Sequence, residues 1–346
     1  MATLDKSMNR PRAEKIDTIS DEMWNKINPF NRKMAEEFLR ESTHLSVQTL
    51  KQYPSALKIF FYWVFEECDD KKIIDIKSKD FLKYQNSLQR RGLSEKGVRF
   101  KRSVISSMNE YILLYYQDEH PTFRNFITKQ IKVNKTGEVY KKEPVTPEEY
   151  ITLCNSLEVA EEWQKLAYLK FTYSTGCRRA ETLQLKKDII SAEQIIAKVK
   201  IKDENGIEQE VESKSYRTPL IRCKGKGELG VPRRLQFSQD AMNAIKKWIE
   251  FRGEDDCEFV FISKYRGSIN QTSEATIGSW CKSFESVIGR RFHPHLLRES
   301  RATNVVVHEG KDIEVARKLL GHQSSETTKI YVIRESDDDA NDAFID

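Results

Sequence analysis

The sequence predicts a mainly α-helical protein with a small antiparallel β-sheet, an α+β fold made of two domains. Between about residues 28 and 128, apolar side chains recur every three or four positions, which is the spacing of amphipathic helices. Residues 194–237 differ, because short runs of β-branched residues alternate there with stretches that favour turns. A chain of 346 residues is long enough for two domains that each bury a hydrophobic core.

The predicted first domain, residues 28–128, is a compact bundle of four or five helices. Ser46 can cap a helix with an apolar stripe, and Ser78 and Ser94 are each expected to begin another helix. Residues 1–27 are polar and lack sustained periodicity, so we expect them to form a flexible N-terminal arm.

Basic residues gather in two places, and both suit a polyanionic partner such as double-stranded DNA. The first set lies at the turn before the fourth predicted helix and in the first part of that helix: Arg90, Arg91, Lys96, Arg99, Lys101 and Arg102. The second is residues 129–145, which contain Lys132 and Lys135 and are typical of an interdomain linker that wraps around a charged ligand. Solvated surface helices also carry such charges, so the pattern alone leaves a generic basic surface open.

The predicted second domain, residues 146–333, begins with a capping box in which Thr146 and Glu149 satisfy each other's backbone groups. Its β-rich insert is expected to form about three strands. Helices are expected to resume near Asp240 and again near Ser273.

The composition and the C-terminal end limit the class of protein. Residues 334–346 form an acidic tail with six acids and one base, a net of −5, so a chain of net charge +5 carries about +10 elsewhere. The six cysteines form no CxxC pair and no cluster with histidine, which predicts reduced thiols and neither disulfides nor a metal site. With no apolar signal segment and no run of membrane-spanning length, we expect a soluble, cytoplasmic protein without a membrane partner.

Two patterns in the second domain place arginines where they could bind one phosphodiester. Arg178 follows a Thr–Gly turn and opens a helix, with Glu181 three residues later. His295 and Arg298 are also three residues apart, so both side chains leave the same face of another helix. Two guanidinium groups from separate elements can clamp the non-bridging oxygens of a phosphate and stabilise charge that develops in its transition state.

A third pattern supplies a histidine and a nucleophile. Gly321 is expected to end a helix, so His322 lies where the chain changes direction, and Tyr331 follows nine residues later, after Thr327 and Thr328. Taken singly, such a tyrosine is more often a half-buried packing residue, and such a histidine is often an ordinary helix terminator. The combination of the three patterns makes the functional interpretation stronger than the structural one.

These motifs closely resemble those of the tyrosine recombinase, or phage integrase, family. That family shows a T-G-x-R-x-x-E turn, an H-x-x-R helix and a G-H pair about nine residues before a T-x-x-Y nucleophile, and this chain has all of them in order. The predicted first domain resembles the core-binding domain of the family, through Ser46, Thr49 and Tyr53. The resemblance covers roughly residues 28–333, and it therefore implies a core-binding domain followed by a catalytic domain.

The resemblance implies a role for each matching residue. Arg178 and Arg298 would clamp the scissile phosphate, and Glu181 would support the first of these arginines. His295 would act as a base or proton relay, and His322 would form a hydrogen bond to the phosphate. Tyr331 would be the nucleophile. The lysine of the family lies on a β-hairpin, which matches Lys224, with Lys226 as the rival because a register slip of one residue exchanges their faces. The chain departs from the family at Glu299, where a second histidine is frequent.

The implied activity is site-specific DNA recombination by a homotetramer acting on two DNA sites. Tyr331 would form a 3′-phosphotyrosyl bond, and strand rejoining would need neither metal nor ATP nor any other cofactor. Implied partners are double-stranded DNA with a specific site, further copies of the chain, and accessory directionality or bending proteins. Two alternatives remain open: a catalytically inactive DNA-binding regulator on the same fold, and a type IB topoisomerase.

Overall fold

The computed structural model describes residues 13–43, 45–135, 143–202, 208–223, 230–322, 324–329 and 332. The chain divides into two compact units, Met1–Lys141 and Lys142–Asp346. The first unit is helical, and every strand that the structure describes belongs to the second. The mainly α-helical class with small antiparallel sheets is confirmed.

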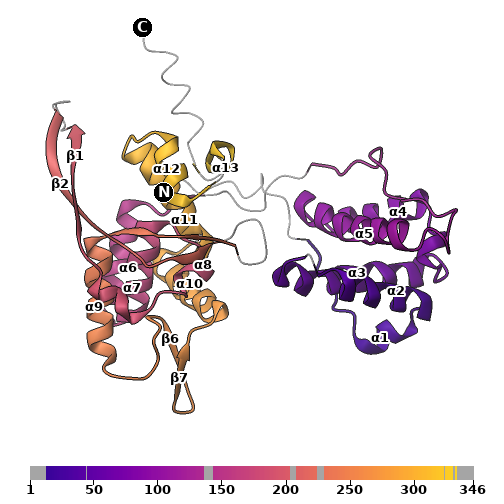
Figure 1. Cartoon of the computed structure of the whole chain (residues 1–346), viewed down its shortest axis with the longest axis horizontal. Coiled ribbons are helices and arrows are strands. Elements are labelled where there is room, and N and C mark those ends of the chain that lie inside the picture. Colours follow the sequence, from indigo (N-terminus) through magenta and orange to yellow (C-terminus); the bar gives the residue numbers. More distant parts are fainter. Residues whose placement is uncertain are drawn as a thin grey trace, which may run out of the picture. The chain divides into compact units, whose positions relative to one another are not determined.

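In its described residues, the first unit is a bundle of five α-helices around an aromatic core. Figure 1 labels these helices. The helices are α1 (Asp21–Lys26), α2 (Pro29–Glu41), α3 (Val47–Glu67), α4 (Ser78–Arg90) and α5 (Glu95–Tyr115). Phe60 of α3 is fully buried, and its ring contacts those of Phe81, Tyr84 and Phe126 at centroid distances of 6.5, 5.0 and 6.3 Å. These ring pairs supply much of the apolar area that holds the bundle together.

The predicted starts of three helices in the first unit are confirmed. The hydroxyl oxygens of Ser46 and Ser94 accept the backbone N–H groups of Thr49 and Gly97, at 3.2 and 3.1 Å. Ser78 is the first residue of α4, as predicted, and the carboxylate of Asp80 accepts the backbone N–H of Lys77, the residue in the cap position. Local side-chain chemistry therefore sets these helix boundaries.

The predicted flexible arm, residues 1–27, needs a correction. Residues 1–12 lie outside the described part of the chain, but α1 occupies Asp21–Lys26 and Ser20 caps it. Ile27 is 1% exposed and belongs to the core of the first unit, and Trp24 packs against that core. Two large apolar residues over so short a segment gave too little periodicity to reveal the helix from the sequence.

The predicted basic linker, residues 129–145, is anchored at both described ends. In the first unit, Arg102 donates to the backbone oxygens of Thr128 and Ile131, at 2.6 and 2.5 Å. In the second unit, Val145 is fully buried, and its N–H donates to Ser300 Oγ at 2.7 Å. Parts of the predicted linker are thus held within the two units, and residues 136–142 lie outside the described part of the chain.

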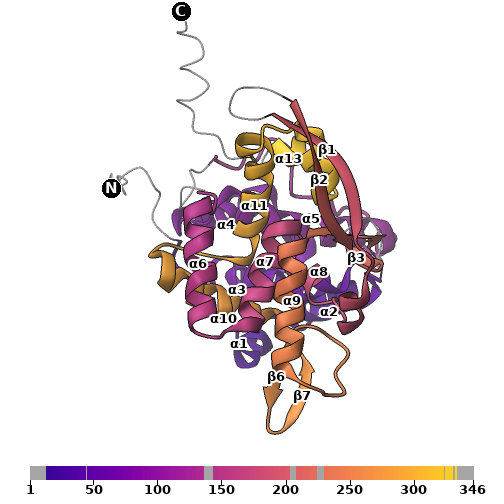
Figure 2. The same cartoon turned by 90° about the vertical axis from the view of Figure 1, so that its left-hand side faces the viewer.

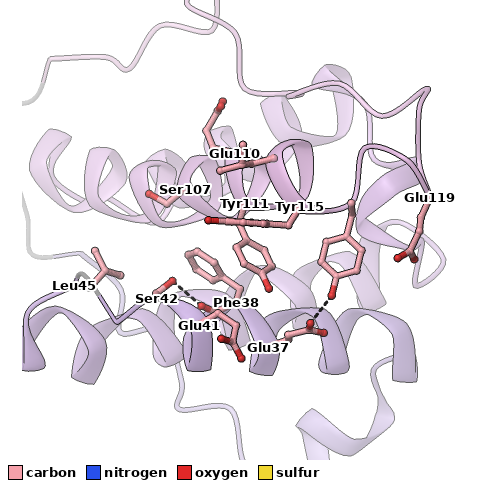
Figure 3. Close-up of a pocket in the computed structure, with 12 residues that line it drawn as sticks. Glu37, Phe38, Glu41, Ser42, Leu45, Ser107, Glu110, Tyr111, Tyr115 and Glu119 are labelled. Carbon is pink, nitrogen blue, oxygen red and sulfur yellow. Dashed lines mark hydrogen bonds between the residues drawn. The ribbon is translucent and has the colours of Figure 1, made fainter.

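A groove of about 740 Å³ lies between the C-terminal halves of α2 and α5 in the first unit (Figure 3). The hydroxyl of Tyr116 donates to Glu37 in this groove, at 2.5 Å. Three further glutamates line it, namely Glu41, Glu110 and Glu119, and none of the predicted DNA-contact residues does. This acidic face of the first unit is unsuited to a phosphate backbone, unlike the basic start of α5.

The second unit contains eight α-helices in its described residues, with one hydrophobic core. They are α6 (Pro147–Val159), α7 (Trp163–Thr175), α8 (Arg179–Thr182), α9 (Gln239–Arg252), α10 (Glu274–Ile288), α11 (Pro294–Thr303), α12 (Ile313–Leu320) and α13 (Ser325–Lys329). The predicted capping box is confirmed, since Thr146 and Glu149 exchange hydrogen bonds of 3.0 and 3.2 Å.

Over the described residues, the strands form three antiparallel sheets, where the sequence predicted one. β1 (Ile195–Lys202), β2 (Glu208–Arg217) and β5 (Gln236–Ser238) form the first sheet, β3 (Ile221–Cys223) and β4 (Val231–Arg233) the second, and β6 (Ile262–Tyr265) and β7 (Ser268–Gln271) the third. Figure 2 shows β1 and β2 as a long two-stranded ribbon beside the helices. The β6–β7 hairpin was missed because its strands are short and largely polar.

Candidate active site

The turn after α7 is the first wall of the site. Gly176 ends α7 with φ of 60°, and a Cβ at this position would lie 2.5 Å from Leu320 Cδ2, so glycine is required for both conformation and packing. The carbonyl oxygen of Gly176 accepts a hydrogen bond from Arg298 Nη1 at 2.6 Å. This hydrogen bond connects the turn that precedes Arg178 to Arg298, the arginine of the second motif.

Arg178 is held by a buried carboxylate. It occupies the cap position of α8, where its backbone N–H donates to Glu181 Oε2 at 2.9 Å and its Nη1 donates to Glu181 Oε1 at 2.8 Å. The side chain of Glu181 is 2% exposed and that of Arg178 is 26% exposed. Burial alone would raise the pKa of Glu181, but the hydrogen bonds from Arg178 and the charges of Arg178 and Arg233 outweigh it and lower that pKa. Glu181 is therefore ionised, and Arg178 remains partly open to a ligand.

Arg298 is completely buried, at 0% exposure, on α11. Its Nη2 atom donates to the backbone oxygen of Leu320 at 2.8 Å and lies 2.8 Å from His322 Nε2. With the bond to Gly176, one guanidinium links α11, the turn after α7 and the end of α12. These bonds fix the position of a buried positive charge at the centre of the site.

His322 follows Gly321, which ends α12 in the left-handed conformation with φ of 66°, as predicted. The ring is 5% exposed, and its Nδ1 atom lies 2.9 Å from Thr328 Oγ1. Because Arg298 can only donate, Nε2 is the acceptor, and the ring proton of a neutral His322 lies on Nδ1. Burial and then the charges of Arg298 and Arg178 lower the pKa of His322 to about 4.

His295 is the second residue of α11 and is exposed. Its charge is among the causes that lower the pKa of His322, which places it in the same electrostatic environment as the two arginines. His293, two residues earlier, caps α11 instead: its Nδ1 accepts the N–H of Leu296 at 3.1 Å.

Three predicted residues lie outside the described part of the chain: Tyr331, Lys224 and Lys226. The structure does describe the strands that flank the two lysines, since Cys223 of β3 pairs with Val231 of β4. The structure therefore brings together Arg178, Glu181, Arg298 and His322, with His295 beside them.

Sequence reasoning missed two residues of the site. Thr328 belongs to the third motif but was given no role of its own. It is fully buried, and its hydroxyl forms a hydrogen bond with the His322 ring. Arg233, at the end of β4, lies 3.7 Å from Glu181 Oε2 through its Nη2 and donates to the backbone oxygen of Leu319 at 3.1 Å. Thr328 could have been inferred from its place before the tyrosine, whereas no local signal marks Arg233.

The predicted DNA-contact residues fall into two groups. Six are exposed: Arg90, Arg91, Lys96, Arg99, Lys132 and Lys135. Lys101 and Arg102 are half-buried, and burial lowers the pKa of both side chains. The guanidinium of Arg102 is bonded within the domain, to the oxygens of Gln85, Thr128 and Ile131.

Over the described residues, no three or more His, Cys, Asp or Glu side chains form a group that could hold a metal ion. Likewise, no helix in the described ranges has the length and apolar character needed to cross a membrane.

Comparison with known proteins identifies the family. The model of the phage integrase family matches residues 143–337, more than half of the chain. The chain is 32% identical to the SPbeta prophage-derived recombinase-like protein YomM of Bacillus subtilis (strain 168), covering 99% of each. In fold it is similar to the XerH site-specific recombinase bound to difH DNA, with a TM-score of 0.65, 20% identity and coverage of 94% of this chain and 86% of that one. It is also similar to a lambda integrase tetramer bound to a Holliday junction, with a TM-score of 0.59, 16% identity and coverage of 91% and 82%. The chain therefore belongs to the phage integrase family of tyrosine-type site-specific recombinases.

Proposed function

We propose that this recombinase cuts and rejoins DNA through a transient 3′-phosphotyrosyl bond to Tyr331. The observation that carries the proposal is the convergence of Arg178, Arg298 and His322 from three separate elements. The positive charges of the two arginines in a low-dielectric setting, with the neutral His322 ring beside them, are what a pentacovalent phosphate transition state needs.

The two arginines play different parts in this proposal. Arg178 is partly exposed and would donate directly to a non-bridging oxygen of the scissile phosphate. Arg298 is fully enclosed, so direct contact requires the polypeptide around it to move. From its buried position it already stabilises negative charge at short range, because little solvent screens it.

The reaction consists of two transesterifications that balance without an external energy source. In the first, the Tyr331 oxygen forms a bond to phosphorus, the bond from phosphorus to the 5′ oxygen breaks, and the tyrosine proton passes to His295 acting as base or relay. The leaving 5′ oxygen takes a proton from Lys224 or from its rival Lys226. In the second, the 5′ oxygen of a partner strand forms a bond to phosphorus and returns its proton to the lysine that acted in the first step. The bond from phosphorus to the Tyr331 oxygen breaks, and that oxygen takes its proton back from His295.

His322 is assigned a neutral, orienting role. Its lowered pKa of about 4 keeps the ring uncharged at neutral pH, and its Nε2 accepts from Arg298. For His322 to donate a hydrogen bond to a phosphate from Nε2, the ring proton would have to move from Nδ1 to Nε2. Nε2 would then lose its hydrogen bond with Arg298 and form one with the phosphate. DNA binding is thereby coupled to a change in the hydrogen bonds of Arg298.

DNA contact by the first unit is proposed for the exposed basic residues at the start of α5 and the end of α4. Arg90, Arg91, Lys96 and Arg99 are exposed, and Arg99 forms a surface ion pair of 2.8 Å with Glu95. Lys132 and Lys135 would follow the backbone beside them, and Lys101 lies next to this surface. Arg102 is already engaged in packing, so we assign it to holding residues 128–131 rather than to DNA.

Assembly as a tetramer on two DNA sites follows from the chemistry, because exchange of strands between two duplexes needs two cleavages in each. The lambda integrase tetramer on a Holliday junction, whose fold is similar, supports this stoichiometry. Accessory directionality or bending proteins remain a prediction. The acidic tail, residues 334–346, lies outside the described residues, and its docking on a neighbouring protomer is a proposal as well.

The test uses DNA fragments tiled from around the gene of the protein. The fragment that binds is placed twice in one plasmid, and the protein is added with no metal or nucleotide. Recombination predicts deletion or inversion of the segment between the sites by wild type and none by Tyr331→Phe. Relaxation of supercoils without any rearranged product would indicate a topoisomerase, and specific binding without either product would indicate a regulator.

A further inference from the structure

Arg233 lies beside the candidate active site, on a strand that none of the three sequence motifs includes. It is the last residue of β4 and stands opposite Ile221 in the antiparallel pair with β3. Its side chain is only 18% exposed, so the guanidinium contacts mostly protein. A charged group buried to this extent is expensive unless several partners compensate it.

One guanidinium group contacts three elements. Its Nε donates to Cys223 Sγ on β3 at 3.1 Å, and its Nη1 donates to the backbone oxygen of Leu319 near the end of α12 at 3.1 Å. Its Nη2 lies 3.7 Å from Glu181 Oε2 on α8. Arg233 therefore ties the β3–β4 hairpin to the carboxylate that holds Arg178 and to the helix that precedes His322.

The guanidinium also packs against the turn that orients His322. A Cβ on Gly321 would collide with Arg233 Nη1 and would lie 2.7 Å from Cζ. Gly321 thus has two reasons to be glycine, its positive φ of 66° and the close approach of this side chain. A side chain in contact with this turn restrains the residue that follows it.

The charge of Arg233 acts on the same groups. Arg178 and Arg233 are the two cations that lower the pKa of the buried Glu181 against the effect of burial, and Cys223 is the other titratable neighbour of that carboxylate. At His322, burial comes first, and the charges of Arg298, Arg178, Arg233 and His295 all lower the pKa. Removing Arg233 should therefore raise the pKa of both groups.

We propose that Arg233 is a positioning residue of the active site, which fixes the Glu181 carboxylate and the Gly321–His322 turn and, through them, Arg178 and His322. The inference rests on the proposed function, because it concerns the rate of the DNA cleavage step. The competing interpretation is that Arg233 only stabilises the fold of the second unit.

The experiment compares three variants of the full-length protein on a nicked DNA substrate that traps the covalent product. Arg233→Met removes the charge and keeps the stem, Arg233→Lys keeps the charge, and Arg234→Met is the matched control. Arg234 is the adjacent residue, is exposed, and donates only a 3.3 Å bond to the backbone oxygen of Thr218 in the described structure. Cleavage rate, DNA affinity and unfolding temperature are measured for each.

For Arg233→Met we expect a cleavage rate lower by about 10- to 100-fold, as for other residues that orient a reactive group indirectly, with DNA affinity within about threefold of wild type. The acid-side midpoint of the rate against pH should rise by at least about half a pH unit, because Glu181 and His322 both take up protons more readily. Arg233→Lys should restore that midpoint, since the charge returns, but only part of the rate, since one ammonium group cannot reach three partners. Arg234→Met should match wild type.

A purely structural role would lower the unfolding temperature and leave unchanged the acid-side midpoint of the cleavage rate against pH, measured on folded protein. That result would overturn the inference. So would a wild-type cleavage rate in Arg233→Met. If Arg233→Met does not fold, Arg233→Lys decides: a full wild-type rate contradicts the positioning role, and a reduced rate with normal affinity and midpoint supports it. Failure of wild type itself to form the covalent product would count against the proposed function instead.

Discussion

Replacing Thr328 by valine removes one hydroxyl from the active site and changes the side-chain volume very little. Thr328 is fully buried, and its Oγ1 lies 2.9 Å from His322 Nδ1. Since Arg298 donates to Nε2, the ring proton lies on Nδ1 and points at this hydroxyl. Thr328→Val therefore leaves a buried N–H group without its acceptor.

The expected loss of stability follows from that single unsatisfied donor. A buried polar group that loses its partner costs about 1–3 kcal/mol, and the additional methyl group returns a part of it. We expect a decrease of about 2 kcal/mol in the free energy of unfolding. For a unit of this size that corresponds to an unfolding temperature lower by about 4–8 °C.

The expected loss of activity comes from the freed ring. Without Thr328, His322 can rotate or change tautomer, and Arg298 loses a fixed acceptor for Nη2. We expect DNA cleavage to slow by about 10- to 100-fold while DNA affinity stays the same. Nitrogen chemical shifts of the His322 ring, measured by NMR, report the tautomer directly.

Two control variants make this test specific. Thr328→Ser keeps the hydroxyl and should retain the wild-type tautomer and most of the activity. Thr327→Val makes the same chemical change one residue earlier, where the hydroxyl lies 3.1 Å from Ser324 Oγ at an exposed site. If Thr328→Val behaves like Thr327→Val, or if the proton of wild-type His322 resides on Nε2, the reasoning is refuted.

Three further predictions concern the surroundings of the site. Gly321→Ala should lower the free energy of unfolding by about 1–2 kcal/mol from its positive φ alone, with more from the collision of its Cβ, and a wild-type melting temperature would contradict this. Glu181→Gln should have a lower free energy of unfolding than wild type at pH 7. Because folding lowers the pKa of Glu181, this difference in free energy should shrink as the pH falls below 4.5, the ordinary pKa of a glutamate. A difference that does not depend on pH between 3 and 7 would contradict the ion pair. Replacing Lys96 and Arg99 together by alanine should weaken DNA binding equally for specific and random DNA and reduce the salt slope by about 2, whereas Lys247→Ala on α9 should leave both unchanged.

Local chemistry made part of the fold predictable from the sequence. The caps at Ser46, Ser94 and Thr146 involve residues only three positions apart, so the sequence contains all the information needed. The pairing of Arg178 with Glu181 is local in the same sense. The first helix escaped prediction because its burial depends on the surface of the bundle that receives it.

Contacts between distant segments required either family resemblance or the structure. Arg298 and His322 are separated by 24 positions, and only their match to known motifs indicated that they meet. Arg233 matched no motif, and its role depends on how a β-hairpin packs against the end of α12, 86 positions further on. Periodicity and spacing carry no information about such packing.

The most direct test of the central claim is to locate the covalent bond between protein and DNA. Wild type and Tyr331→Phe are incubated with a nicked substrate, the protein is digested with protease, and the peptides are analysed by mass spectrometry. The account predicts one nucleotide-bearing peptide that contains Tyr331, which is absent from the variant. An adduct on another residue, an adduct that persists in Tyr331→Phe, or specific DNA binding by wild type with no adduct would contradict it.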